Sequence, residues 1–93
     1  MLSLIPTNLE KLKDKEIDLE VLRLGAIAEL DAINLYEQLA AMTKNKKIKK
    51  ILLDIAKEEK THFGEFQAIL LKLDKEQVEE LKKGEKEVNE LIE

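Results

Sequence analysis

The sequence predicts an all-α protein built from a long antiparallel helical hairpin and a short C-terminal helix. The chain has 93 residues, about the length of one small domain. Charged residues make up 39% of it and aromatic residues only 3%, and it holds three glycines and one proline. Such a composition is typical of long helices rather than of strands and turns. We therefore interpret residues 1–93 as a single helical domain.

The composition also excludes several kinds of site. The chain has no cysteine, so disulfides, thiolate metal sites and cysteine nucleophiles are excluded. The formal net charge is -4, and acidic and basic residues are interspersed, so no basic patch for nucleic acid is expected. No apolar run approaches the roughly 18 residues that a membrane span requires. We expect a cytoplasmic protein that binds neither nucleic acid nor membrane.

The first long helix is predicted over residues 14–43. Residues 1–13 form a lead-in that we expect to be irregular or briefly helical. Asp14 or Asp18 can cap the helix, because a short acidic side chain accepts hydrogen bonds from the unpaired amides of the first turn. The helical pattern breaks at residues 43–45, where Thr, Lys and Asn follow one another. A loop this short forces the next helix to run antiparallel to the first.

The second long helix is predicted over residues 46–73. Asp74 and Gln77 then offer a capping box for a third helix. We expect this helix to end near Gly84, since glycine is the residue most often found just past a helix C-terminus. Residues 74–93 are accordingly interpreted as a short C-terminal helix followed by a charged tail.

Each long helix carries an apolar stripe that ionisable residues interrupt. A lone carboxylate in a packed stripe costs several kcal/mol unless something pairs with it. The interruptions therefore predict that the two helices present these groups to a common partner. The first stripe, at alternating steps of four and three, consists of Leu22, Ala26, Glu29, Ile33, Tyr36 and Ala40. The second consists of Ile48, Leu52, Ile55, Glu59, His62, Phe66, Ile69 and Leu73.

The ionisable residues of the two stripes fall at one depth in the hairpin. Glu29 lies about 15 residues before the centre of the turn and Glu59 about 15 residues after it. Both therefore sit roughly 22 Å from the turn, and His62 lies one helical turn beyond Glu59. We interpret the three side chains as a candidate metal site. A non-metal alternative is that Glu59 and His62 form a buried hydrogen-bonded pair.

Two carboxylates and one imidazole per chain favour iron, manganese or zinc over copper(I) or an iron–sulfur cluster. Di-iron carboxylate bundles use a Glu from each of two helices and a Glu-x-x-His from each of the other two. One chain supplies half of this set. Two chains related by a twofold axis would supply four Glu and two His, and would complete a four-helix bundle with its metals between the subunits.

A second stripe on the first helix predicts a further contact between subunits. It lies roughly 200° around the helix from the first stripe, and a hairpin can cover only one side of its first helix. The alternative is a partly solvated face. The stripe consists of Leu24, Ala28, Asp31, Leu35, Gln38 and Met42.

The segments AIAELDAINLYEQLA and AKEEKTHFGEF resemble the two signature stretches of the encapsulated ferritins. This is a branch of the ferritin and rubrerythrin superfamily in which each chain is a helical hairpin, in effect half a ferritin. The resemblance covers about residues 15–83. It implies that two chains form a ferritin-like four-helix bundle and oxidise Fe(II) to Fe(III) at a di-iron centre shared between them. It also implies an annular decamer housed inside an encapsulin shell.

The resemblance also assigns roles to individual residues. The metal ligands of the family, which are also its catalytic residues, fall on Glu29, Glu59 and His62. The tyrosine that lies beside the site falls on Tyr36. Some members carry an acidic entrance site for metal, of which Asp31 remains in this sequence.

The sequence therefore predicts a ferroxidase, an iron:oxygen oxidoreductase that supplies iron for storage in an encapsulin compartment. Two alternatives stay open. One is a non-enzymatic helical hairpin that self-associates. The other is a rubrerythrin-like peroxidase, or another di-metal oxidase, on the same bundle, because one ligand set can host several reactions.

Overall fold

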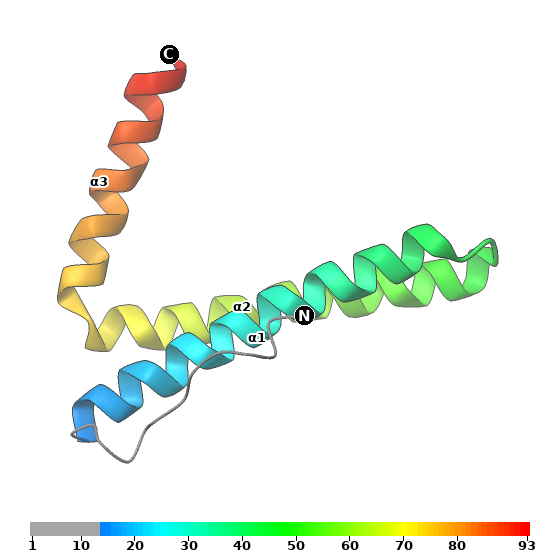
Figure 1. The fold of residues 1–93 in the computed structure, drawn as a ribbon, viewed down its shortest axis with the longest axis horizontal. Coiled ribbons are helices and arrows are strands. Elements are labelled where there is room, and N and C mark those ends of the chain that lie inside the picture. Colours follow the sequence, from blue (N-terminus) through cyan, green and yellow to red (C-terminus); the bar gives the residue numbers. More distant parts are fainter. Residues whose placement is uncertain (1–13) are drawn as a thin grey trace.

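The computed structural model describes residues 14–93, which form three α-helices and no strand. Helix α1 spans Asp14–Met42, α2 spans Lys46–Leu73 and α3 spans Lys75–Ile92. Helices α1 and α2 run antiparallel and side by side, and α3 leaves the open end of this hairpin at a steep angle (Figure 1). The predicted helical hairpin is confirmed. The predicted lead-in lies outside the described residues.

The turn of the hairpin is fixed by side chains that satisfy unpaired backbone amides. The Asn45 side chain accepts hydrogen bonds from the backbone N–H groups of Lys47, at 2.9 Å, and Ile48, at 3.1 Å. The Thr43 hydroxyl accepts one from the Asn45 N–H at 3.2 Å. Asn45 is therefore the N-cap of α2, which explains why the helical pattern stops and restarts within three residues.

Asp74 joins α2 to α3 and makes the elbow between them. Its N–H donates to the Leu70 carbonyl at the end of α2, and its Oδ1 accepts from the Gln77 N–H at the start of α3. Its Oδ2 lies 3.2 Å from Nη2 of Arg23 on α1. The capping role predicted for the Asp74 side chain is confirmed. A single residue thus ends one helix, starts the next and ties the elbow to the hairpin.

Helix α3 extends past Gly84 to Ile92, so the prediction that it ends near Gly84 is wrong. Gly84 does not adopt a positive φ, the conformation in which glycine ends a helix. A glycine inside a helix costs about 1 kcal/mol relative to alanine. Ion pairs between neighbouring turns of α3 oppose this cost. They join Lys82 to Glu79, Lys83 to Glu80 and Lys86 to Glu90.

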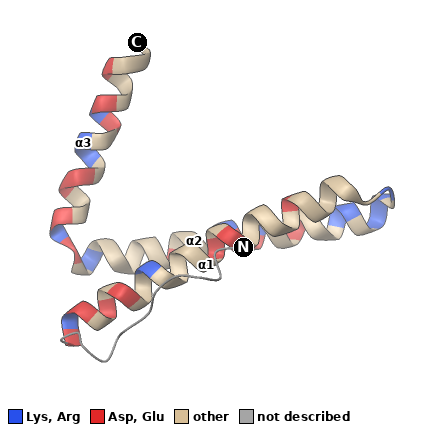
Figure 2. Cartoon of the chain, viewed as in Figure 1, with Lys and Arg blue, Asp and Glu red and all other residues tan. Residues whose placement is uncertain are grey.

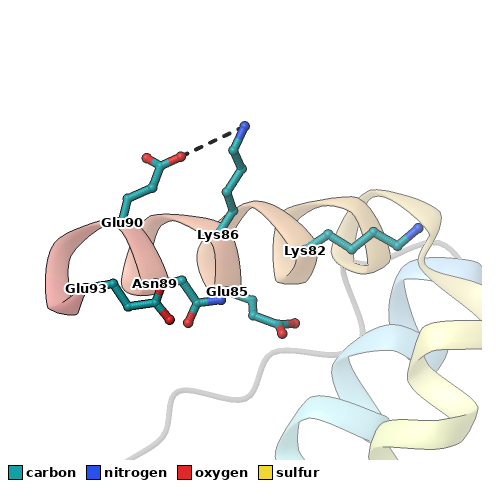
Figure 3. A pocket seen from close by; sticks show the side chains of 6 residues that line it. All are labelled: Lys82, Glu85, Lys86, Asn89, Glu90 and Glu93. Carbon is teal, nitrogen blue, oxygen red and sulfur yellow. Dashed lines mark ion pairs between the residues drawn. The ribbon is translucent and has the colours of Figure 1, made fainter.

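The polar side of α3 carries a shallow depression near its C-terminus (Figure 3). Its lining comes from one helix and mixes both signs of charge, and Lys86 pairs with Glu90 at 3.9 Å. Because no second element forms a wall, we assign no function to it.

The hairpin buries little of its apolar surface within one chain. Among the described residues only Ala40 and Ala56 are buried hydrophobic residues. No described helix combines the length and the apolar character that crossing a membrane requires. Large apolar side chains remain exposed along all three helices, among them Val21, Leu30, Met42, Ile48, Ile51, Leu53, Ile69, Leu73, Val88, Leu91 and Ile92.

Gly25 lies on α1, between Glu29 and the open end of the hairpin. It allows α1 and α2 to approach each other closely at this point. A Cβ atom at this position would overlap the ring of Phe66 on α2. We expect Gly25→Ala to lower the free energy of unfolding by about 1–3 kcal/mol, the usual cost of overpacking. Denaturant unfolding followed by circular dichroism measures this change.

Gly64→Ala is the matched control for this prediction. It is also a helical glycine, but nothing lies within 4 Å of a Cβ added there. We expect it to raise the free energy of unfolding by about 0.4–1 kcal/mol, because alanine restricts the unfolded chain. Equal shifts in the same direction for both variants would contradict the close contact between Gly25 and Phe66.

Candidate metal centre

The structure brings Glu29, Glu59 and His62 together at the middle of the hairpin. Glu29 lies midway along α1, and Glu59 and His62 lie one turn apart on α2. Nδ1 of His62 lies 3.4 Å from Oε2 of Glu59 and 3.7 Å from Oε2 of Glu29. One potential ligand atom from each of the three residues lies within 4.8 Å of the other two.

The cluster is partly buried and open on one side. The side chains of Glu29 and Glu59 are 18% and 19% exposed, whereas that of His62 is 47% exposed. Oε2 of Glu29 is buried and accepts no hydrogen bond. A buried carboxylate oxygen without a partner is unfavourable and calls for a compensating group. A cation held between the three side chains would compensate it.

The electrostatics of the cluster favour added positive charge. The close side-chain contact with the Glu59 carboxyl group, then burial, raises the pKa of Glu29. The same contact, then the contact with His62, lowers the pKa of Glu59. The hydrogen bond with Glu59 and the nearby charges of Glu29 and Glu65 raise the pKa of His62. These shifts show that the three groups interact closely, and a metal ion that bound them would compete with protons for the same ligand atoms.

The donor set fits a first-row divalent metal such as iron, manganese or zinc. Carboxylate oxygens and one imidazole nitrogen are available, and the chain has no thiolate. Three protein ligands leave coordination positions open, as in catalytic rather than structural metal sites. These positions can be filled by a second chain, by water or by a substrate.

The structure does not bring Tyr36 or Asp31 into this cluster within one chain. Both lie on α1, and Asp31 does not belong to the group of acidic and histidine side chains whose ligand atoms converge. Tyr36 is seven residues, roughly 10 Å, from Glu29 along the helix. It can come closer to a metal centre only if that centre includes a second chain.

Two charged residues beside the cluster escaped the sequence reasoning. Glu37 of α1 pairs with Lys60 of α2 at 3.2 Å, and Lys60 directly follows Glu59. Glu37 lies eight residues before Asn45 and Lys60 lies fifteen after it. The two residues are therefore not at equal depth, and only their long side chains bring the charges together. The rule that residues at equal distances from the turn lie opposite each other therefore does not predict this pair.

Comparison with known proteins places the chain and its fold in a family. The sequence model of the rubrerythrin family matches residues 20–92. A crystal structure of the encapsulated ferritin domain from Pyrococcus furiosus superposes with a TM-score of 0.85 and 55% identity, over 99% of this chain and 92% of that one. The ferritin-like–encapsulin shell fusion protein of the same organism is 59% identical over 93 residues.

The encapsulin nanocompartment cargo protein EncC of Myxococcus xanthus is 38% identical over 82 residues. The chain spans about a quarter of the fusion protein, 27% of its length, and 60% of the length of EncC. The matches cover 98% and 88% of this chain. The chain therefore belongs to the rubrerythrin family, among its encapsulated ferritin-like members.

Proposed function

We propose that the protein is a ferroxidase, which oxidises Fe(II) to Fe(III) at a di-iron centre formed between two subunits. The observation that carries this proposal is the cluster of Glu29, Glu59 and His62, in which a buried carboxylate oxygen has no hydrogen-bond partner. The family adds support, because ferritin-like proteins of the rubrerythrin group generally bind and oxidise iron.

The uncovered surface of the hairpin supports a centre shared by two chains. His62 is the most exposed member of the cluster, and large apolar side chains stay exposed on both long helices. A second hairpin packed on this side would cover those of the apolar side chains that lie on the same face as the cluster, and would double the ligand set to four Glu and two His. We propose this pair as the basic unit, and an annular decamer as the larger assembly.

In this proposal Glu29, Glu59 and His62 bind the iron ions and are the catalytic residues. Bound iron supplies the redox chemistry: each Fe(II) loses one electron, and dioxygen accepts it. The carboxylates favour the reaction because hard, charged oxygen ligands stabilise Fe(III) more than Fe(II). Tyr36 lies beside the centre without binding metal, and Asp31 belongs to the entrance by which iron reaches it.

The names of the relatives support a role inside a protein shell. One relative is fused to an encapsulin shell protein and another is an encapsulin cargo protein. We propose that this chain acts in the cytoplasm within an encapsulin compartment, and that the shell keeps the ferric product.

Iron is expected to stabilise the assembly, because metal that bridges two chains binds the assembled state only. Native mass spectrometry under anaerobic conditions, with and without Fe(II), should show a shift toward larger species with an even number of subunits. Admission of air should then produce ferric absorbance. Identical mass distributions, or masses without bound iron, would contradict a centre shared between subunits and favour a non-enzymatic hairpin.

The family match favours one second candidate, a rubrerythrin-like di-metal peroxidase. Both reactions use the same ligands, so the oxidant distinguishes them. Rates of Fe(II) oxidation by dioxygen and by hydrogen peroxide, at equal oxidant concentration, decide the point. A ferroxidase turns over with dioxygen, whereas a peroxidase requires peroxide.

A further inference from the structure

The orientation of the His62 ring decides which of its two nitrogens can bind a metal. Nδ1 lies 3.4 Å from Oε2 of Glu59 and 3.7 Å from Oε2 of Glu29. The two nitrogens of an imidazole point in widely different directions, so Nε2 is directed away from these carboxylates. It forms no hydrogen bond within residues 14–93. A metal held in the cluster would bind Nδ1 and would leave the Nε2–H without a partner from the cluster.

A ligating imidazole needs an acceptor for its second nitrogen. The neutral ring carries one proton, and it binds a metal through the nitrogen that has none. The carboxylates of Glu59 and Glu29 accept hydrogen bonds, so they attract this proton to Nδ1, the nitrogen that the metal needs. An acceptor on the side of Nε2 would hold the proton there and would leave Nδ1 free for the metal.

Glu65 of α2 is placed to be this acceptor. It lies three residues after His62, and residues three apart are neighbours on the surface of a helix. Side chains of an α-helix lean toward its N-terminus, which directs Glu65 toward the turn that carries His62. Glu65 is exposed, and its carboxylate forms no hydrogen bond or ion pair in the part of the chain that the structure describes. Rotation about its side-chain bonds can bring it to Nε2.

The sequence around Glu65 offers its carboxylate no competing cation on α2. The neighbours three and four residues away along the helix are Thr61, His62, Ala68 and Ile69. Of these, only His62 can carry a positive charge. The lysines of residues 44–50 lie at the tip of the hairpin (Figure 2), and Lys50 is fifteen residues, roughly 22 Å, from Glu65 along the helix.

The charge of Glu65 already acts on the imidazole. The hydrogen bond with Glu59 does most to raise the pKa of His62, and the charges of Glu29 and Glu65 raise it further. Glu29 and Glu59 lie on the side of Nδ1. Of these three carboxylates, Glu65 is therefore the one that remains for Nε2.

We propose that Glu65 is a positioning residue of the metal centre, which accepts a hydrogen bond from the Nε2–H of His62 and thereby presents Nδ1 to the metal. This inference rests on the proposed function, since it concerns one ligand of the same centre. Glu65 does not touch the metal. Its charge increases the basicity of the imidazole, and the hydrogen bond fixes the orientation of the ring, as outer partners of ligating histidines do.

Zinc binding tests this role without any redox chemistry. Zn(II) accepts the same carboxylate and imidazole ligands, and isothermal titration calorimetry measures its affinity. We expect Glu65→Ala to weaken Zn(II) binding roughly 10–100-fold, the usual cost of losing an outer partner of a metal ligand. Glu65→Gln should recover part of this loss, because its amide oxygen still accepts a hydrogen bond although it carries no charge.

Glu58→Ala is the matched control. Glu58 lies four residues before His62, so it is also a neighbour on the helix surface, and it is exposed like Glu65. Its side chain leans away from His62, toward the start of α2. The two alanine variants remove the same charge from the same helix, but only Glu65→Ala should weaken zinc binding. Equal losses in both variants, or unchanged affinity in Glu65→Ala, would overturn the proposal.

The single histidine of the chain allows a direct measurement on the ring. Nuclear magnetic resonance of the isotope-labelled, untagged chain with Zn(II) bound shows which ring nitrogen holds zinc and which holds a proton. In the original chain we expect zinc on Nδ1 and a slowly exchanging proton on Nε2. In Glu65→Ala this proton should exchange with water and lose its signal. Zinc on Nε2 in the original chain, or a Nε2 proton signal that survives in Glu65→Ala, would overturn the proposal.

Failure of this inference and failure of the proposed function give different results. Zinc affinity and the Nε2 proton do not depend on the oxidation of iron. A chain that binds zinc through Nδ1 with the help of Glu65, but does not oxidise Fe(II), would contradict the ferroxidase alone. A chain that oxidises Fe(II), but binds zinc equally well with and without Glu65, would contradict the role of Glu65 alone.

Discussion

Replacement of Glu59 by alanine is expected to reduce the rate of Fe(II) oxidation at least a hundredfold. Loss of residues that merely orient metal ligands already costs roughly 10–100-fold. In a twofold centre one substitution removes two ligands at once. The fold should survive, because the change removes a partly buried carboxylate whose burial is unfavourable without a cation. Stopped-flow absorbance of the ferric product measures the rate, and circular dichroism measures the helical content.

Glu58→Ala is the matched control. Glu58 is the neighbouring residue on α2, is exposed, and does not belong to the cluster. Both variants remove one carboxylate from the same helix and change the net charge equally. Full activity in Glu59→Ala would refute the ligand assignment. Comparable losses in both variants would show that overall charge, and not the cluster, controls the reaction.

Glu29→Ala and His62→Ala extend the test to the other two ligands. Each should lose iron oxidation as severely as Glu59→Ala. Loss of helical content in all three variants would instead favour the structural alternative, in which Glu59 and His62 form a buried hydrogen-bonded pair in a non-enzymatic hairpin.

The hairpin and its cluster could be predicted because both follow from local rules. Helical periodicity places Glu59 and His62 on one face, and the three-residue turn fixes the direction and depth of the neighbouring helix. Glu29 then falls opposite Glu59 without any knowledge of side-chain packing. The break at residues 43–45 was also predicted from the helical pattern, whereas the capping role of Asn45 comes from the structure.

Features that depend on the relative rotation of the helices could not be predicted in this way. The contact between Gly25 and Phe66 requires the two backbones to face each other at one particular point. Helix α3 continues through Gly84, and the ion pairs between neighbouring turns that oppose the cost of the glycine depend on side-chain geometry that residue type alone does not reveal. The five lysines among residues 44–50 form a basic segment that can be read directly from the sequence, but a prediction based on the overall charge balance did not identify it.

Isolated protein given excess Fe(II) in air is expected to oxidise it and then to precipitate ferric oxide in bulk. The hairpin and the α3 helix that projects from it give the molecule extents of 47 × 43 × 21 Å, and the described residues enclose almost no interior. In the proposed dimer the metal centre would lie near an open surface, and a ring of such dimers would leave the product exposed to solvent. The proposed function therefore separates oxidation from storage and assigns storage to a surrounding shell.

The separation of iron oxidation from iron storage is tested by measuring soluble iron per chain after centrifugation. The comparison is between the isolated chain and the same chain fused to an encapsulin shell protein, the arrangement that one relative has. Both should oxidise iron at similar rates per chain, because the centre is the same, but only the fused protein should keep ferric iron in solution. Hundreds of iron atoms retained by each isolated oligomer would show that the chain stores iron by itself, and would contradict a ferroxidase that depends on a shell.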